Sequence, residues 1–368
     1  MTIGVIATIF STIFLTVMVV ADRLMIGDCF EDNPTYAWII SAIAGCAFGM
    51  LATVLLWLFF ITTTTHTALE ILSGIPELFF PYGLLILLSG ILSIQTLKHY
   101  FECFSVGGES TAIAGWLAAT PIIVLSIISV IHVLHDSLPF IHTWNLEQVN
   151  IGYEFVIFSI VATLALISFE IFTSESSNSN TSGNYLKPVT LMLIANAMYA
   201  VIIHVTINTA ILQTNIPSGL MLVTLLPFYW IGFLAGVRPL IKKFHRDEFK
   251  RRWGSRIKYY LPAILFTEVI GMLVFFTEFF GLGTTDPTFV SIIIGSHIIL
   301  VYLIMKGLSI LRYVFEKRSQ EIWLVFGMQV TVSRLPYFKI DLKYILIEIF
   351  LLFLVAAALY HLTQVVLL

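Results

Sequence analysis

Apolar runs longer than about 18 residues recur along the whole chain, and no other feature limits its fold as strongly. A run of this length can cross the hydrocarbon core of a bilayer as an α-helix. The composition agrees, because 58% of the residues are hydrophobic, 11% are charged and the mean hydropathy is +0.96. An ordinary soluble domain has roughly 25% charged residues. The sequence therefore predicts an all-α integral membrane protein without a separate soluble domain.

Division of the chain at polar and turn-forming clusters predicts about ten transmembrane helices. The expected spans are Thr2–Ala21, Thr35–Phe60, Leu78–Phe101, Thr111–Val133, Ile151–Phe172, Pro188–Leu212, Ser218–Ile241, Lys258–Phe280, Phe289–Leu311 and Lys343–His361. Helices of about 20 to 25 residues span a hydrocarbon core of roughly 30 Å with some tilt. The first span lacks a basic n-region and a small-residue cleavage site, so we expect a retained helix rather than a signal peptide.

A polar segment divides the chain into two halves with five expected helices each. Residues 174–187 are rich in Ser and Asn and cannot bury much apolar area, so we expect a linker between residues 1–173 and 188–368. The segment holds the glycosylation sequon Asn180-Thr181-Ser182, a weak signal in so short a Ser/Asn tract.

A faint internal repeat relates the two halves. Phe101–Pro121 aligns without gaps on Phe276–Ser296, which places Gly108 on Gly283, although few residues are identical. Because five is an odd number, two five-helix repeats must have opposite orientations in the membrane, as in many secondary transporters. The alternative is a chance alignment of two apolar halves.

Lys and Arg cluster in loops that are expected on one side of the membrane. Of the 19 basic residues, nine fall between Arg238 and Lys258 and six between Arg312 and Lys343. Arg23 and Lys187 belong to further loops on that side, and Lys98 and Lys306 stand near helix ends that face it. The positive-inside rule then places these loops in the cytoplasm and both termini outside.

Motifs of known enzymes are absent from the sequence. It has no Gly-x-Ser-x-Gly, His-Glu-x-x-His, Walker-type or Asp-rich prenyl-diphosphate motif, so we expect no enzyme activity and no cofactor. His132, His135, Asp136 and His142 have a spacing that could bind a metal, but an outer loop that happens to be His-rich is the favoured interpretation, and we predict no metal site.

Two further features have plain interpretations. We interpret the basic loop around Lys242–Arg252 as a segment that fixes the orientation of the chain in the membrane. Binding of anionic lipid head groups, or in principle of nucleic acid, is the alternative. We expect no nucleic-acid partner. Cys29, Cys46 and Cys103 have neither metal-ligand nor redox spacing, so we expect them to pack in the interior.

The junction of the third and fourth expected helices resembles a known family. Leu97-Lys98-His99-Tyr100-Phe101-Glu102-Cys103-Phe104 leads to a Gly-containing turn at Gly107-Gly108 and then to a helix with Ala119-Thr120-Pro121. This run, with Ala21-Asp22-Arg23 and Asn33-Pro34 before the second helix, resembles the ten-helix EamA-type branch of the drug/metabolite transporter superfamily. The resemblance implies ten helices in two inverted halves and transport of a small metabolite.

Polar residues inside the expected spans are the candidate functional residues, since each costs free energy in lipid and usually faces a partner or a cavity. Glu268 and His297 lie closest to the expected midplane. We predict that they face the bundle interior, border a central cavity and couple to each other directly or through water. Two unrelated packing residues are the alternative.

The sixth and fourth expected helices supply the remaining candidates. Asn196, His204 and Asn208 share one broad face of the sixth, where they could bind substrate or make hydrogen bonds between helices. On the fourth, Trp116 is a further binding candidate. Pro121 is a candidate hinge, or else a kink that improves packing.

Together these features predict a secondary transporter that moves a small metabolite by alternating access, with proton coupling as an option. We expect a multi-pass protein of the bacterial inner (cell) membrane, with the bilayer and a small-molecule substrate as partners. A membrane-embedded enzyme or lipid-handling protein without a known motif is the second interpretation, and a receptor or assembly factor is the third.

Overall fold

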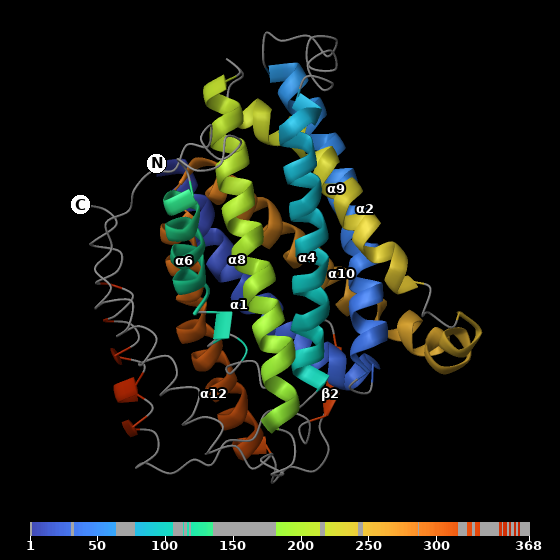
Figure 1. The fold of residues 1–368 in the computed structure, drawn as a ribbon. Coiled ribbons are helices and arrows are strands. Elements are labelled where there is room, and N and C mark those ends of the chain that lie inside the picture. Colours follow the sequence, from blue (N-terminus) through green and yellow to red (C-terminus); the bar gives the residue numbers. More distant parts are fainter. Residues whose placement is uncertain are drawn as a thin grey trace.

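The computed structural model shows a bundle of long helices that lie side by side (Figure 1). The structure describes residues 2–30, 33–63, 78–105, 113, 116–117, 119–134, 182–213, 218–241, 246–285, 287–315, 322–325, 328–331, 346–347, 349–351, 353–354, 357 and 360.

Helices account for nearly all of the described chain. The first half contains α1 (Thr2–Phe30), α2 (Pro34–Thr63), a π-helical turn η1 (Phe79–Gly83) that leads directly into α4 (Leu84–Ser105), and α6 (Thr120–Leu134). The second half contains α8 (Ser182–Gln213), α9 (Ser218–Ile241), α10 (Arg246–Thr284), α11 (Pro287–Gly295) and α12 (His297–Phe315). An antiparallel hairpin of β1 (Ile322–Val325) and β2 (Met328–Thr331) follows, with Ile322 opposite Thr331.

Seven helical segments in the described residues are long and apolar enough to cross a membrane. Two of them are composite, one formed by η1 with α4 and the other by α11 with α12, and α6 adds a shorter apolar helix. The prediction of a helical, multi-span membrane protein is confirmed, while the short hairpin of β1 and β2 was not expected. The expected fifth span, Ile151–Phe172, lies outside the described residues, and the expected tenth, Lys343–His361, is described only at isolated positions.

The outer surface of the bundle is apolar, as a bilayer requires. On α2, Leu51, Leu55 and Leu58 are each more than half exposed, and on α12 Leu303 and Ile310 are exposed to the same degree. Apolar surface on this scale is unfavourable in water and favourable against lipid chains. The long apolar helices and this surface together make the chain a multi-pass integral membrane protein.

Several helices are longer than the sequence suggested. Helix α1 continues past the expected Ala21 to Phe30, and α10 starts twelve residues before the expected Lys258 and ends at Thr284. The sequence at these ends contains no proline that would stop a helix. The helices therefore continue for further turns through the polar residues. Helix α8 begins at Ser182, so the end of the expected linker, residues 182–187, is helical.

The basic ends of the described helices lie together. Helix α1 is antiparallel to α10, because Gly4 meets Thr284 and Thr285 while the Thr267 hydroxyl lies 3.6 Å from Met25 Sδ. The end of α1 that carries Arg23 is therefore on the same side as the basic start of α10, which is the lower side in Figure 1, away from the end marked N. This placement matches the charge distribution on which the predicted orientation is based.

Glycines bring α4 and α9 into close contact. A Cβ atom at Gly90 would overlap the carbonyl oxygen of Tyr229, and one at Gly232 would overlap that of Leu87. Small residues of this kind allow two backbones to approach in a membrane, where packing rather than the hydrophobic effect drives helix association. The α4–α9 pair therefore forms a tight contact with no room for larger side chains.

Candidate functional site

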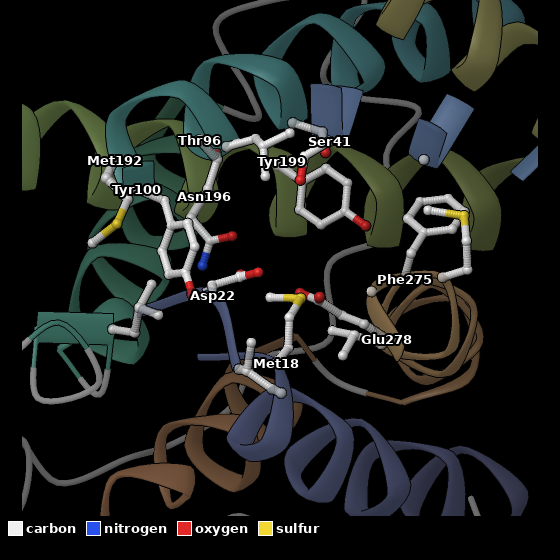
Figure 2. A pocket seen from close by; sticks show the side chains of 18 of the residues that line it. Met18, Asp22, Ser41, Thr96, Tyr100, Met192, Asn196, Tyr199, Phe275 and Glu278 are labelled. Atoms are coloured by element: carbon white, nitrogen blue, oxygen red, sulfur yellow. Dashed lines mark hydrogen bonds between the residues drawn. The ribbon is translucent and has the colours of Figure 1, made fainter. Parts of the chain in front are cut away.

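A cavity of about 200 Å³ lies inside the bundle, between the two halves of the chain. Its wall is formed by α1, α2 and α4 from the first half and by α8, α9 and α10 from the second, with contributions from α6 and α11. Figure 2 shows Asp22, Asn196 and Glu278 pointing into this space from α1, α8 and α10. The cavity is therefore enclosed by many helices and has polar groups in its wall.

Three carboxyl groups line the cavity. Asp22 is buried and accepts a hydrogen bond of 3.1 Å from the Tyr100 hydroxyl. Glu268 is buried and accepts a hydrogen bond from Ser41 on α2. Glu278 has no hydrogen bond or ion pair with any residue that the structure describes. Only two of the three acidic side chains thus have a protein donor in the described chain.

No described residue that lines the cavity is Lys, Arg or His. A charged carboxylate inside a membrane protein normally pairs with a cation or with several donors, because desolvation is costly. The hydroxyl groups of Tyr100 and Ser41 each supply one hydrogen bond but no positive charge. The cavity is therefore acidic as well as enclosed.

Aromatic rings cover another part of the wall. Tyr229 stacks on Phe275 with a centroid distance of 4.4 Å, and Trp230 lies 5.0 Å from the same ring. The Tyr229 hydroxyl donates to Ser93 Oγ at 2.7 Å, and Trp230 Nε1 donates to Thr53 Oγ1 at 2.9 Å. These hydrogen bonds hold the rings in fixed orientations, so the aromatic surface is preformed.

Two interrupted helices border the cavity. Helix α6 starts at Thr120, directly after a turn in which the Ala119 N–H donates to the Trp116 carbonyl at 2.9 Å. Helix α11 ends at Gly295 and α12 starts at His297, with a turn at Ser296 between them. Thr120 lines the cavity next to the first interruption, and Ile294 lines it next to the second.

The structure brings together two of the residues that the sequence singled out. Glu268 and Asn196 both line the cavity, although they are on different helices and 72 residues apart in the chain. Asn196 makes no hydrogen bond within the described residues, and Figure 2 shows its amide directed toward Asp22. The predicted polar face of the sixth expected helix thus reaches the cavity through this residue.

His297 lies elsewhere. Its side chain is buried, its Nδ1 is 2.6 Å from the Ile294 carbonyl oxygen, and its Nε2 has no partner in the described part of the chain. It is not among the residues that line the cavity, and the described contacts include none between His297 and Glu268. The hydrogen bond to Ile294 instead fixes the imidazole against the turn between α11 and α12.

His204 joins α8 to α10, and neither His204 nor Asn208 is among the residues that line the cavity. His204 Nδ1 donates to the Leu282 carbonyl of α10 at 2.9 Å, and Asn208 Nδ2 donates to the His204 carbonyl at 3.0 Å. The first of these is an interhelical hydrogen bond, the alternative that we gave for this face.

Trp116 and Pro121 stand at the interruption before α6. Trp116 packs against the core, and its buried Nε1 has no partner within the described ranges. Pro121 is the second residue of α6 rather than the middle of a continuous helix, so the expected span Thr111–Val133 is corrected here. A proline fits the first turn, since its missing N–H is not needed there.

The sequence did not single out Asp22 and Glu278. Asp22 followed the expected end of the first helix, and Glu278 came two residues before the expected end of the eighth. Because α1 and α10 extend further, both carboxyl groups fall inside the bundle. Acidic side chains at a helix surface often pair with a basic residue three or four positions away. Glu278 has no such neighbour in the sequence, and this absence could have indicated that its side chain faces the interior.

Metal binding has no support in the described residues, which contain no group of three or more His, Cys, Asp or Glu side chains able to hold an ion. Of the His-rich segment after the fourth expected helix, His135, Asp136 and His142 lie outside the described residues, as does the side chain of His132. The three cysteines are buried, as expected.

No protein family and no curated protein sequence matches this chain in a comparison of sequences. The geometry of the cavity is therefore the main source of evidence for function.

Proposed function

We propose that this chain is a secondary transporter that moves a small metabolite by alternating access. The observation that carries the proposal is the cavity between the two halves, which has polar groups in its wall and is bordered by two interrupted helices. Membrane transporters commonly bind substrate where helices are discontinuous, because unwound backbone is tolerated only where it faces protein or a cavity. Membership of the EamA-type branch, with ten helices, is part of the same proposal.

The packing of the helices supports an inverted repeat. A twofold axis in the membrane plane that exchanged the halves would pair α1 with α8, α2 with α9 and α4 with α10. It would convert the α1–α10 contact into the α4–α8 contact, and both are among the most extensive contacts in the bundle. It would also map the contact between α2 and α9 onto itself.

The two interruptions give independent support for this repeat. In the alignment of Phe101–Pro121 with Phe276–Ser296, Thr120 corresponds to Gly295. Thr120 is the first residue of α6, and Gly295 is the last residue before the turn that precedes α12. The two turns, at Ala119 and Ser296, therefore lie within two residues of each other in the alignment, and each interruption borders the cavity.

The proposal has further parts that come from the sequence. Energy would come from an ion or substrate gradient, with proton coupling as one form, since the sequence has no nucleotide-binding motif. The basic loops would face the cytoplasm of a bacterial cell, with the termini outside.

Accessibility of one cysteine tests the proposal without knowledge of the substrate. Replacement of Cys29, Cys46 and Cys103 by serine gives a background for Thr96→Cys, which places a thiol in the cavity wall. A membrane-impermeant thiol reagent should label this cysteine in right-side-out and in inside-out vesicles, because alternating access opens the cavity to each side in turn.

Leu51→Cys is the matched control, since Leu51 is 56% exposed on the apolar outer surface of α2 and should react from neither side. Reaction of the Thr96→Cys variant from one side alone, under all ion gradients, would contradict alternating access.

A further inference from the structure

The charge of the cavity limits what it can bind. The ionisable carboxyl groups of the wall belong to Asp22, Glu268 and Glu278, and no described lining residue is Lys, Arg or His. A carboxyl group in such a site is costly to charge unless a cation lies close to it. A positively charged guest would supply that cation, so the free energy of binding should favour it over an anion.

Unused hydrogen-bonding groups also face a guest. Glu278 and Asn196 point into the cavity and have no hydrogen-bond partner in the described chain (Figure 2). Thr120 is only 4% exposed, lines the same cavity and has a hydroxyl without a partner within those residues. Buried polar groups are nearly always hydrogen-bonded, so the Thr120 hydroxyl indicates that a ligand supplies its missing partner. Glu278 and Asn196 are half-buried and offer further polar groups to the same ligand.

The aromatic wall selects the kind of cation. Tyr229, Trp230 and Phe275 form part of the wall, and aromatic rings both give apolar contact and attract cations through their quadrupoles. A bare inorganic ion gains nothing from apolar area, and no described cluster suits a metal. An organic ammonium group attached to an apolar body uses both the carboxyl groups and the rings.

The size of the cavity limits the guest as well. Its volume of about 200 Å³ is below the roughly 300 to 1,000 Å³ of sites for drug-sized ligands. We propose that the cavity binds a small organic ammonium cation with an apolar or aromatic body. Glu278 is its main counter-ion, and Asn196 accepts a hydrogen bond from its N–H group. That this ligand is the transported substrate rests on the function proposed above.

Binding to the purified protein in detergent tests the ligand class. The probes are 2-phenylethylammonium, the anion 3-phenylpropionate as a match in size, and sodium chloride alone. Only 2-phenylethylammonium should raise the melting temperature, and it should give saturable heat in calorimetry, because a ligand that binds the folded state stabilises it. Equal or stronger binding of 3-phenylpropionate, stabilisation by sodium ions alone, or no binding of the ammonium probe would each overturn the proposal.

Variants locate the site. Glu278→Gln keeps the size of the side chain and removes the charge, so the Kd for 2-phenylethylammonium should rise by about tenfold or more. Asn196→Leu should weaken binding by a smaller factor. Glu102→Gln is the matched control: Glu102 pairs with His99 and Lys98 outside the cavity, and its loss should leave the Kd unchanged. An unchanged Kd in both cavity variants would overturn the assignment.

The two proposals fail in different ways. If 2-phenylethylammonium binds through Glu278 but Thr96→Cys is labelled from one side only, the ligand class stands and transport is wrong. If labelling occurs from both sides and no ammonium probe binds, transport stands and the ligand class is wrong.

Discussion

The α4–α9 contact and the α1–α10 contact join helices in contrasting ways. In the first, Gly90 and Gly232 let backbone meet backbone, and no side chain separates the helices at those points. In the second, hydroxyl groups reach across, as in the bond of 3.3 Å from Ser11 Oγ to the Val274 carbonyl, and Asp22 and Glu278 border the cavity. We infer that the α4–α9 contact depends on close backbone packing, whereas the α1–α10 contact leaves space for polar side chains that border the cavity.

The largest loss of stability should follow from Gly232→Ala. The new methyl group would overlap the Leu87 carbonyl, so α4 and α9 must separate, at a cost of about 3 kcal/mol. Thermal and denaturant unfolding in detergent would measure the loss. Unchanged stability would contradict the close contact between the two helices.

A smaller loss is expected for Tyr100→Phe on the cavity side. The variant removes the hydroxyl that donates to the buried Asp22 and leaves the carboxyl without that donor, at a cost of about 2 kcal/mol. The same unfolding assay applies. If the aromatic pair of Tyr100 and Phe104 carries the stability instead, the variant should unfold like the wild type.

Glu278→Gln should raise the stability of the ligand-free protein, in contrast to the two variants above. Its carboxyl has no described partner, so replacement by an amide should stabilise the ligand-free protein by about 1 kcal/mol while ammonium binding weakens. The melting temperature without and with 2-phenylethylammonium would measure both effects. A variant that is less stable than the wild type without ligand would show that Glu278 has a structural partner.

The smallest change in stability is expected for Gly307→Ala, which is the control for Gly232→Ala. Nothing lies within 4 Å of a Cβ atom at Gly307 in α12, so alanine meets no clash there. Alanine in a helix is favoured over glycine by roughly 0.5 to 1 kcal/mol, and a slight rise in melting temperature is expected. A marked loss in this variant would show that glycine replacement destabilises these helices regardless of contacts.

Much of the fold was predictable because apolar length determines membrane helices directly. The expected spans Thr35–Phe60 and Ser218–Ile241 nearly coincide with α2 and α9, since Pro34 and Pro217 mark the starts of those segments. The interruptions before Thr120 and at Ser296 were not predicted, since an apolar run continues through both. Hydropathy measures transfer to lipid and does not report where a backbone turns.

The candidate site was predictable only in part, for a similar reason. Glu268 and Asn196 were found because they interrupt apolar runs far from any expected end. Asp22 and Glu278 were missed because an error of a few residues in a helix end decides whether a carboxyl reaches water or a cavity. The contact of His204 with Leu282 depends on the packing of α8 on α10, which periodicity within one helix does not determine.

Uptake of a permanently charged probe into proteoliposomes tests the central claim most directly, namely that the cavity is the transport site for an organic cation. Trimethylphenylammonium is suitable because it cannot cross the bilayer by losing a proton. It has no N–H to donate to Asn196, so its recognition rests on the carboxyl groups and the aromatic rings. We predict saturable uptake by the wild type and by Gly307→Ala, and a loss of about tenfold or more for Glu278→Gln. Uptake no faster than in protein-free liposomes, or equal uptake by the Glu278→Gln variant, would contradict the account.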